Sequence, residues 1–212
     1  MFNRQQLINS LSHGTRRVPW LTLILAGLTI VFYFAGPGVF DILIYEKTAI
    51  RQGQIWRCLS GHFVHCNFEH LFWDLVGLII LTVMIERHDQ RQVIPALLMS
   101  CLGVSLWLYW GDSPFQNYCG LSGALNGLLV VAASLYYRVT KNKIYILAIV
   151  LTVIKMIFEF TTHQTIFTDL ASQSVPGAHA AGFITGFIYI YLHKVGSRRL
   201  AVHVDLSETA SP

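Results

Sequence analysis

The sequence predicts an all-α membrane protein, a bundle of six transmembrane helices with both termini in the cytoplasm. Hydrophobic residues make up 54% of the 212 residues and charged residues only 12%, whereas soluble domains carry about 25% charged residues. Six long apolar stretches and the placement of Lys and Arg supply the other two reasons. We expect the membrane domain to cover residues 18–196, between a cytoplasmic segment at 1–17 and a polar cytoplasmic tail at 197–212.

Each of the six stretches approaches the ~20 apolar residues that a helix needs to cross a bilayer. Gly36-Pro37-Gly38 ends the first stretch, and Pro176 opens the last at a position that suits the first turn of a helix. No clear cleavage site follows the first stretch, so we expect a retained helix and not a signal peptide. The predicted spans cover residues 18–36, 67–85, 92–110, 119–137, 143–162 and 177–194.

The positive charges alternate between the two ends of these spans. Eleven of the 15 Lys and Arg residues fall before span one, between spans two and three, between four and five, or after span six. The opposite loops hold only Lys47, Arg51 and Arg57, and Lys155 lies within span five. By the positive-inside rule both termini are cytoplasmic. The net charge of +4 is thereby explained by the bilayer, and we predict no nucleic-acid partner.

Ser122 lies at the outer end of span four, within Gly120-Leu121-Ser122-Gly123. The glycines allow a substrate backbone to approach, and a loop running into a helix start leaves free N–H groups that favour an anion. A serine needs a base to become a nucleophile. The other interpretation is that Gly123 and Gly127 form only a small-residue packing face.

His179 opens span six at the same predicted depth. Gly182 and Gly186 follow it at three and seven residues, so all three share one helix face. If that face packs on the glycines of span four, the imidazole approaches the Ser122 hydroxyl and can act as its general base. The pair Ser122 and His179 therefore predicts a hydrolase.

Further polar residues precede and enter span two: Trp56-Arg57, His62, His65, His70 and Asp74. Together with Gly120–Gly123 and the His179–Gly186 pattern, they make the chain similar to the rhomboid intramembrane serine proteases. The resemblance covers nearly the whole chain. It implies a six-helix bundle and a catalytic dyad of Ser122 and His179 without a third acid. We expect no cofactor and no metal.

The same resemblance implies that His70 and the residue at Asp74, with the Ser122 N–H, hold the developing oxyanion. The family has asparagine where this chain has Asp74, and an ionised carboxylate cannot donate a hydrogen bond. Asp74 either stays protonated through desolvation or accepts the N–H of His70 and favours its imidazolium form; we favour the second. A third possibility is that Asp74 pairs with a donor of the outer loop. His65 is expected to be structural, and His62 to be exposed at the interface.

Span five contains Lys155 and Glu159 one turn apart. They are either a polar anchor near a substrate gate, since the resemblance implies that this helix is mobile, or a self-contained pair reaching toward the outer interface. Asn126 either bonds within the core or holds a water molecule. Cys58, Cys66 and Cys119 lie toward the outer side, where a disulfide is permitted, but the sequence selects no pair, and free thiols are the expectation.

The compact first loop and the Gly-His-Phe-Val-His and Gly-Leu-Ser-Gly-Ala-Leu stretches resemble the rhombosortase branch of bacterial rhomboids. The resemblance implies single-pass membrane substrates with a C-terminal Gly-Gly-type tail, and an active site that faces the periplasm from the bacterial inner membrane. Two alternatives stay open. One is a non-catalytic rhomboid-like protein that binds client helices, and the other is a membrane metal or haem protein that uses the histidines.

Overall fold

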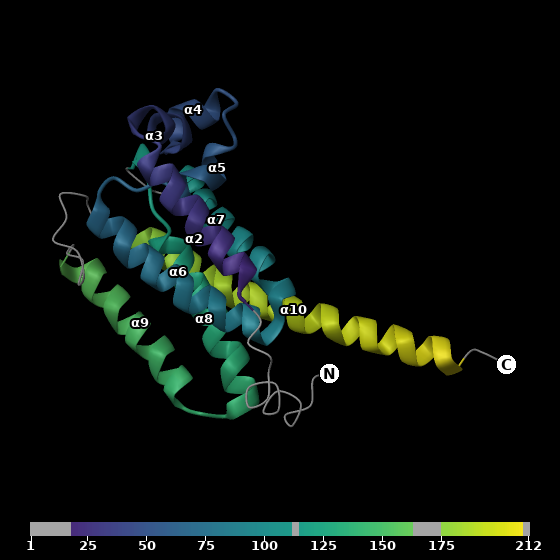
Figure 1. Ribbon diagram of the computed structural model, residues 1–212. Coiled ribbons are helices and arrows are strands. Elements are labelled where there is room, and N and C mark those ends of the chain that lie inside the picture. The colour runs from purple at the N-terminus through teal and green to yellow at the C-terminus, as the bar shows by residue number, and fades with distance from the viewer. Residues whose placement is uncertain (1–17, 112–114, 163–174, 210–212) are drawn as a thin grey trace.

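The computed structural model describes residues 18–111, 115–162 and 175–209, with side chains described as far as residue 195. Six long helices dominate it (Figure 1), and each largely overlaps one of the six predicted stretches. These helices are α2 (Trp20–Phe34), α6 (Phe68–Asp89), α7 (Val93–Trp110), α8 (Ser122–Thr140), α9 (Ile144–Thr162) and α10 (Pro176–Thr209).

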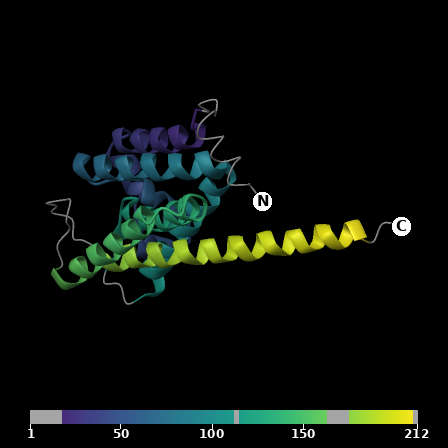
Figure 2. The same ribbon diagram turned by 90° about the horizontal axis from the view of Figure 1, so that it is seen from below.

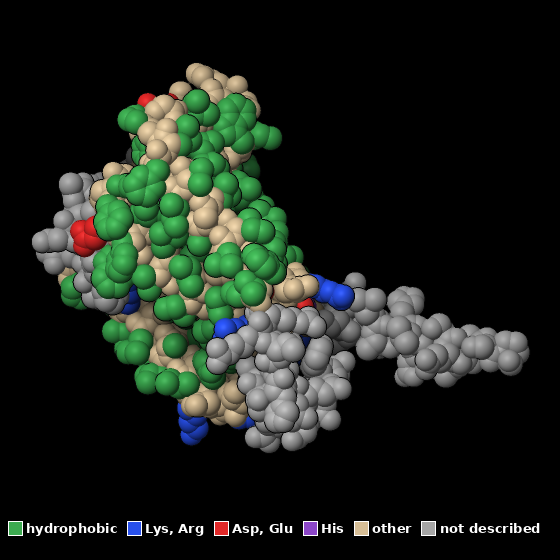
Figure 3. All heavy atoms as spheres, in the orientation of Figure 1, with side chains coloured by type: hydrophobic (Ala, Val, Ile, Leu, Met, Phe, Trp, Pro, Cys, Tyr) green, Lys and Arg blue, Asp and Glu red, His purple; other side chains and the backbone are tan. Residues whose placement is uncertain are grey.

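Within the described residues, two helical segments are long and apolar enough to cross a membrane, and a bent pair of helices qualifies as a third. Among the described residues, Phe68–Trp110 (α6 and α7, joined by the short helix η2 at Gln90–Gln92) and Ile144–Thr162 (α9) meet the length and composition of a span. Helix α2 and the short helix α3 (Pro37–Leu43) meet it only together, with a bend of 118° between them. Hydrophobic side chains cover most of the visible surface in Figure 3, and the Lys and Arg side chains gather along its lower edge. The protein is a multi-pass membrane protein.

Helix α8 is the centre of the bundle. It packs against α6, α7, α9 and most extensively against α10, and the buried side chains of Leu121, Leu125, Leu128 and Val131 belong to the main core cluster. Helix α9 lies to one side in Figure 1 and buries only Thr152, Met156 and Glu159. The N-terminal end of α8, which carries Ser122, is therefore surrounded by protein more than by lipid.

Glycines let α8 and α10 approach to backbone contact. A Cβ atom added to Gly182 would overlap the carbonyl group of Gly123, and one added to Gly186 would lie 2.5 Å from the carbonyl oxygen of Gly127. Small residues at helix interfaces allow this close approach in membranes. The two glycine faces predicted from the sequence pack against each other.

Two helix lengths differ from the predicted stretches. Helix α2 ends at Phe34 because Gly36, with φ of +89°, and Pro37 redirect the chain into α3. Helix α10 continues to Thr209, well beyond the predicted end at 194, and is seen from below in Figure 2 as one long rod. No proline interrupts residues 177–209, and a polar helix can extend beyond a bilayer where water satisfies its side chains.

The first loop is a small structured unit. It contains β1 (Tyr45–Glu46), α4 (Lys47–Arg51), α5 (Arg57–Ser60) and the 3₁₀ helix η1 (Gly61–Phe63). The buried guanidinium of Arg57 donates to the carbonyl oxygens of Asp41 and Ile44 at 2.8 and 2.7 Å, and to Gln54 Oε1 at 2.7 Å. Arg57 thus ties the start of α5 to α3 and to the residue that joins α3 to β1, through donors that a single planar side chain supplies.

This loop is joined to the segment before α8. Strand β1 pairs antiparallel with β2 (Asn117–Tyr118), with Tyr45 opposite Tyr118. The N–H of Gly120 donates to the carbonyl of Gly61 at 3.2 Å. Three residues separate β2 from Ser122, so the first loop helps to position the start of α8.

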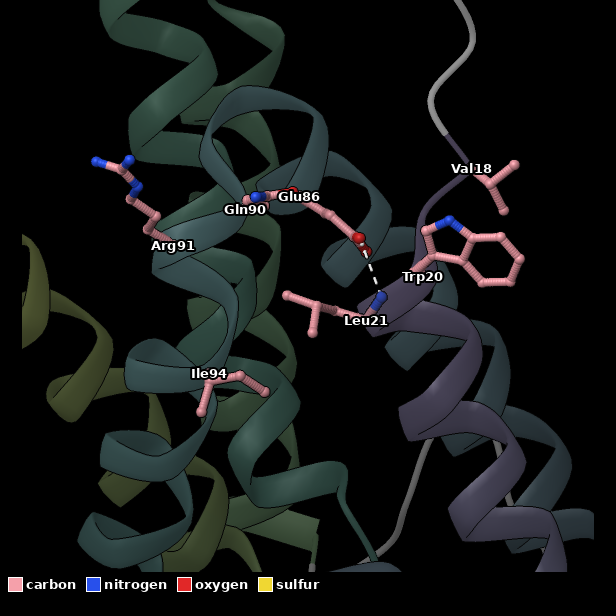
Figure 4. A pocket seen from close by; sticks show the side chains of 7 residues that line it. All are labelled: Val18, Trp20, Leu21, Glu86, Gln90, Arg91 and Ile94. Atoms are coloured by element: carbon pink, nitrogen blue, oxygen red, sulfur yellow. Dashed lines mark hydrogen bonds between the residues drawn. The ribbon is translucent and has the colours of Figure 1, made fainter.

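A surface pocket lies at the opposite end of α6 from His70 and Asp74 (Figure 4). Its wall includes Glu86, whose carboxylate accepts the backbone N–H groups of Leu21 and Thr22 at 3.0 and 2.9 Å. Glu86 therefore caps the free N–H groups at the start of α2. These hydrogen bonds fasten α2 to α6. The residues that line the pocket include no serine, threonine or cysteine that could act as a nucleophile.

Candidate active site

Ser122 is the first residue of α8. Gly120, two residues before it, has φ of +102°, a left-handed conformation that favours glycine. A Cβ atom at Gly120 would also collide with the His70 ring. The chain can therefore make this tight turn into α8 only with glycine at position 120, and the turn directs the N–H groups of Leu121 and Ser122 toward α6.

His179 lies in the first turn of α10 and is 6% exposed. Its Nε2 atom is 3.1 Å from Ser122 Oγ. The glycine contacts between α8 and α10 bring the two helix ends together, as the shared face of His179, Gly182 and Gly186 suggests. The distance suits proton transfer from the hydroxyl to the imidazole.

Glu159 of α9 adds a carboxylate to this pair. Its Oε2 atom lies 2.7 Å from His179 Nδ1, and its Oε1 atom lies 2.5 Å from Lys155 Nζ. The Glu159 side chain is fully buried. The resemblance implied a dyad without a third acid, and the self-contained Lys155–Glu159 pair was one open interpretation. The pair is not self-contained, because Glu159 bonds to the histidine as well as to the lysine, and this carboxylate beside His179 is one that the resemblance did not lead us to expect.

The second polar centre surrounds Asp74 of α6. Its Oδ2 atom accepts the backbone N–H groups of Leu121 at 2.6 Å and Ser122 at 3.1 Å, and lies 2.9 Å from His65 Nε2. His70 Nε2 is farther away, at 3.4 Å. Two backbone N–H donors and two imidazole rings face this one buried oxygen, and hydrogen bonds donated to a carboxylate favour its ionised form.

The three possibilities for Asp74 can now be compared with these contacts. The favoured hypothesis was that Asp74 mainly accepts from His70. That contact is the longest of the four, at 3.4 Å, so His70 is not the main partner of Asp74. The outer-loop donor is His65, which has the place expected of a structural histidine. Sequence reasoning missed the two backbone contacts: Asp74 occupies the N–H of Ser122 that was expected to be free for an oxyanion.

Three neighbouring side chains complete the support of the site. Asn126 donates to the Ser122 carbonyl at 2.8 Å, and Tyr118 Oη accepts the N–H of Gly123 at 3.3 Å. The expectation that His62 is exposed is wrong, since the side chain is 1% exposed and its Nε2 lies 3.0 Å from Ser105 Oγ. Burial lowers the pKa of His62 to about 4, so the ring is neutral at pH 7 and fastens the first loop to α7.

Two groups of side chains have donor atoms close enough to share a metal ion. They are Cys66, His70 and Cys119, and His65, His70 and Asp74; within each group the donor atoms lie within 4.8 Å of one another. The second group is already explained by hydrogen bonds to Asp74. In the first, hydrogen bonding between the two thiols lowers the pKa of Cys66 and raises that of Cys119.

The arrangement supports one kind of chemistry above others. With its hydrogen on Nδ1 facing Glu159, the His179 imidazole presents a lone pair at Nε2 to the Ser122 hydroxyl. A serine, a histidine and a carboxylate in this order are the elements of nucleophilic acyl transfer, and the triad is recognised by geometry and roles.

Comparison with known proteins places the chain in a family. The Rhomboid domain family matches residues 52–194, which include every residue of the two polar centres. The chain belongs to the rhomboid family. It is also 28% identical over 156 residues to RHOMBOID-like protein 5 of Arabidopsis thaliana. That match covers 71% of this chain and 49% of the plant protein, so the rhomboid described here spans about half the length of the curated relative it matches.

Proposed function

We propose that this rhomboid is an intramembrane serine endopeptidase in which Ser122 is the nucleophile and His179 the general base. The observation that carries the proposal is the continuous contact from Ser122 Oγ to His179 Nε2 at 3.1 Å and from His179 Nδ1 to Glu159 Oε2 at 2.7 Å. Ionisable groups inside a membrane bundle are expensive and mark functional sites by default. A serine hydroxyl and two ionisable groups, joined by hydrogen bonds and contributed by three helices, favour catalysis over packing.

The reaction would proceed in two stages. Ser122 Oγ attacks the scissile carbonyl carbon while His179 Nε2 takes the hydroxyl proton, and the carbonyl oxygen becomes an oxyanion. The imidazolium, stabilised by the Glu159 carboxylate, then gives the proton to the leaving nitrogen as the C–N bond breaks. Water then attacks the acyl-enzyme ester, with His179 again as the base. The ester bond breaks, Ser122 regains its proton, and the new carboxyl terminus is released.

The oxyanion needs donors, and Ser122 N–H is the donor closest to the nucleophile. It bonds to Asp74 at 3.1 Å, more weakly than the Leu121 N–H at 2.6 Å. In our proposal Ser122 N–H turns to the oxyanion while Asp74 keeps Leu121 and His65. His70 then lies beside the developing charge as a second donor. Losing one such donor typically lowers the rate by ~10²–10³.

For orientation and substrate we propose six spans with both termini in the cytoplasm of a bacterial inner membrane. The distribution of Lys and Arg supports this orientation, and it places Ser122 toward the periplasm. The resemblance to rhombosortases supports single-pass substrates with a Gly-Gly-type motif, one hydrophobic helix and a basic end. Such a tail presents its scissile bond near the outer face, where Ser122 would lie.

The first test uses a fluorescent fluorophosphonate on purified protein in mild detergent. We expect the wild type to be labelled, and Ser122→Ala and His179→Ala to remain unlabelled while folding normally. A co-expressed reporter with a Gly-Gly-type tail then tests the substrate class. Cleavage that depends on Ser122 and on the Gly-Gly motif supports it, and cleavage that ignores the motif contradicts it.

A second candidate function is a non-catalytic protein that binds client helices. The observation that favours it is the Asp74 carboxylate at the Ser122 N–H, where an oxyanion would be repelled. If folded wild-type protein stays unlabelled while an active rhomboid protease is labelled in parallel, the protease proposal fails and the client-binding function takes its place.

A further inference from the structure

Two of the four cysteines approach each other beside the oxyanion-binding segment. Cys66 lies in the bend just before α6, and Cys119 lies between β2 and the Gly120 turn. Their sulfur atoms are within 4.8 Å of each other. By contrast, Cys101 is fully buried in the core of the bundle. Proximity therefore selects one pair among three outward cysteines that the sequence could not distinguish.

The pair is accessible to thiol exchange. Cys66 is exposed and Cys119 is half-buried, and neither lies within a helix that would hold its side chain away from the other. The thiolate is the attacking form of cysteine, and the hydrogen bond from Cys119 favours the thiolate at Cys66. The two residues thus have the roles of an exposed attacking thiol and a protected resolving thiol.

We propose that Cys66 and Cys119 form a disulfide bond that fastens the Gly120 turn to the start of α6. The proposal rests on the proposed orientation, which exposes both thiols to an oxidising compartment. Cys66 attacks a sulfur of a protein disulfide donor and releases one donor thiol. Cys119 then attacks the mixed disulfide at Cys66 and releases the second donor thiol, so the donor is reduced by two electrons and takes up both protons.

The position of the bond gives it a consequence for the site. Cys119 immediately precedes Gly120, whose turn aims the N–H groups of Leu121 and Ser122. Cys66 lies two residues before α6, whose first two turns carry His70 and Asp74. A covalent link would hold the N–H donors of Leu121 and Ser122 in a fixed position relative to the Asp74 carboxylate. Fixing such groups before the reaction is how an enzyme stabilises a developing charge.

The test is made on the wild-type protein. Membranes are treated with N-ethylmaleimide before solubilisation, the protein is digested without reduction, and the peptides are analysed by mass spectrometry. We expect a cross-linked pair of peptides containing Cys66 and Cys119, two hydrogen masses below the sum of the free peptides, and lost on reduction. Cys66→Ser should abolish the pair, while Cys58→Ser serves as the matched control and should keep it.

Two outcomes overturn the proposal. Complete alkylation of both cysteines means that the thiols are free. Alkylation that appears only after a zinc chelator is added means that a soft metal holds them, with His70 as the third ligand.

Fluorophosphonate labelling separates this proposal from the proposed protease activity. A protein that carries the disulfide bond yet is never labelled supports the disulfide and refutes the protease. Reduction should slow labelling of the wild type and leave the already reduced Cys66→Ser unaffected.

Discussion

The strongest prediction concerns Glu159→Gln, which exchanges one carboxylate oxygen for an amide group of almost the same shape. In the wild type, Glu159 accepts from Lys155 through Oε1 and from His179 Nδ1 through Oε2. An amide has only one acceptor oxygen. The Lys155 ammonium, which can only donate, would take it and turn the NH₂ group toward His179. The imidazole would then carry its hydrogen on Nε2, the atom that must accept from Ser122.

The expected size follows from this change of tautomer. In a serine protease whose triad carboxylate is replaced by an amide, the wrong tautomer lowers the rate by ~10⁴. We expect Glu159→Gln to lose ~10³–10⁴ in the rate of fluorophosphonate labelling, equivalent to about 4–5 kcal/mol of activation free energy at 1.36 kcal/mol per tenfold. Thermal unfolding should show that the variant still folds.

The double variant Lys155→Ala with Glu159→Gln separates positioning from folding. Without the ammonium, the amide is free to turn its oxygen to His179 Nδ1 and restore the productive tautomer. We therefore expect the double variant to be labelled faster than Glu159→Gln alone, although it has lost one more contact. Thr161→Ala, on the exposed side of the same helix, is the control. Labelling of Glu159→Gln within threefold of wild type, or no gain in the double variant, would refute the reasoning.

Three further predictions follow from single contacts. Asp74→Asn keeps an acceptor for His65 and gains a donor for the oxyanion, so labelling should stay within about tenfold of wild type, while Asp74→Ala should lose ~10²; equal losses would contradict it. Gly182→Ala forces α8 and α10 apart and should lower thermal stability by about 1–3 kcal/mol, whereas Gly27→Ala, with open space around it, should be neutral or stabilising. Arg57→Lys cannot reach all its acceptors and should lower the unfolding temperature in a thermal melt, and an unchanged melt would show that the guanidinium contacts add nothing.

The helices and the Ser122–His179 contact follow from patterns that the sequence shows directly. In the sequence, each long helix corresponds to a long apolar stretch with turn residues at its ends. Two glycine faces at matching depth predict the contact between α8 and α10, because glycines allow helix backbones to touch. The histidine shares the face of its glycines, so the helix period alone brings it to the serine.

The contacts of Glu159 and Asp74 could not be predicted in the same way. Glu159 and Lys155 are one turn apart, and a pair of this kind is satisfied within its own helix. Which helix the pair faces depends on how α9 lies against the bundle, and the sequence of α9 is apolar on nearly every side. Glu159 nevertheless shares a stripe with Thr152 and Met156, at spacings of four and three residues, and that stripe was the available signal. The contact between His62 and Ser105 of α7 also could not be predicted, because it depends on how the first loop folds.

The polar residues of the site also help to specify the fold. Asp74, Ser122, Glu159 and His179 come from α6, α8, α9 and α10, and each bonds to a residue of another helix. Within a bilayer no water replaces a missing partner, so an unsatisfied group of this kind costs several kcal/mol. Apolar surfaces, in contrast, pack on lipid tails about as well as on each other. Helix α9 packs on α8 and α10 but buries few side chains, so the bond from Glu159 to His179 ties it to α10. The same carboxylate therefore orients the base and holds the helix, and a folding control is part of every test of its catalytic role.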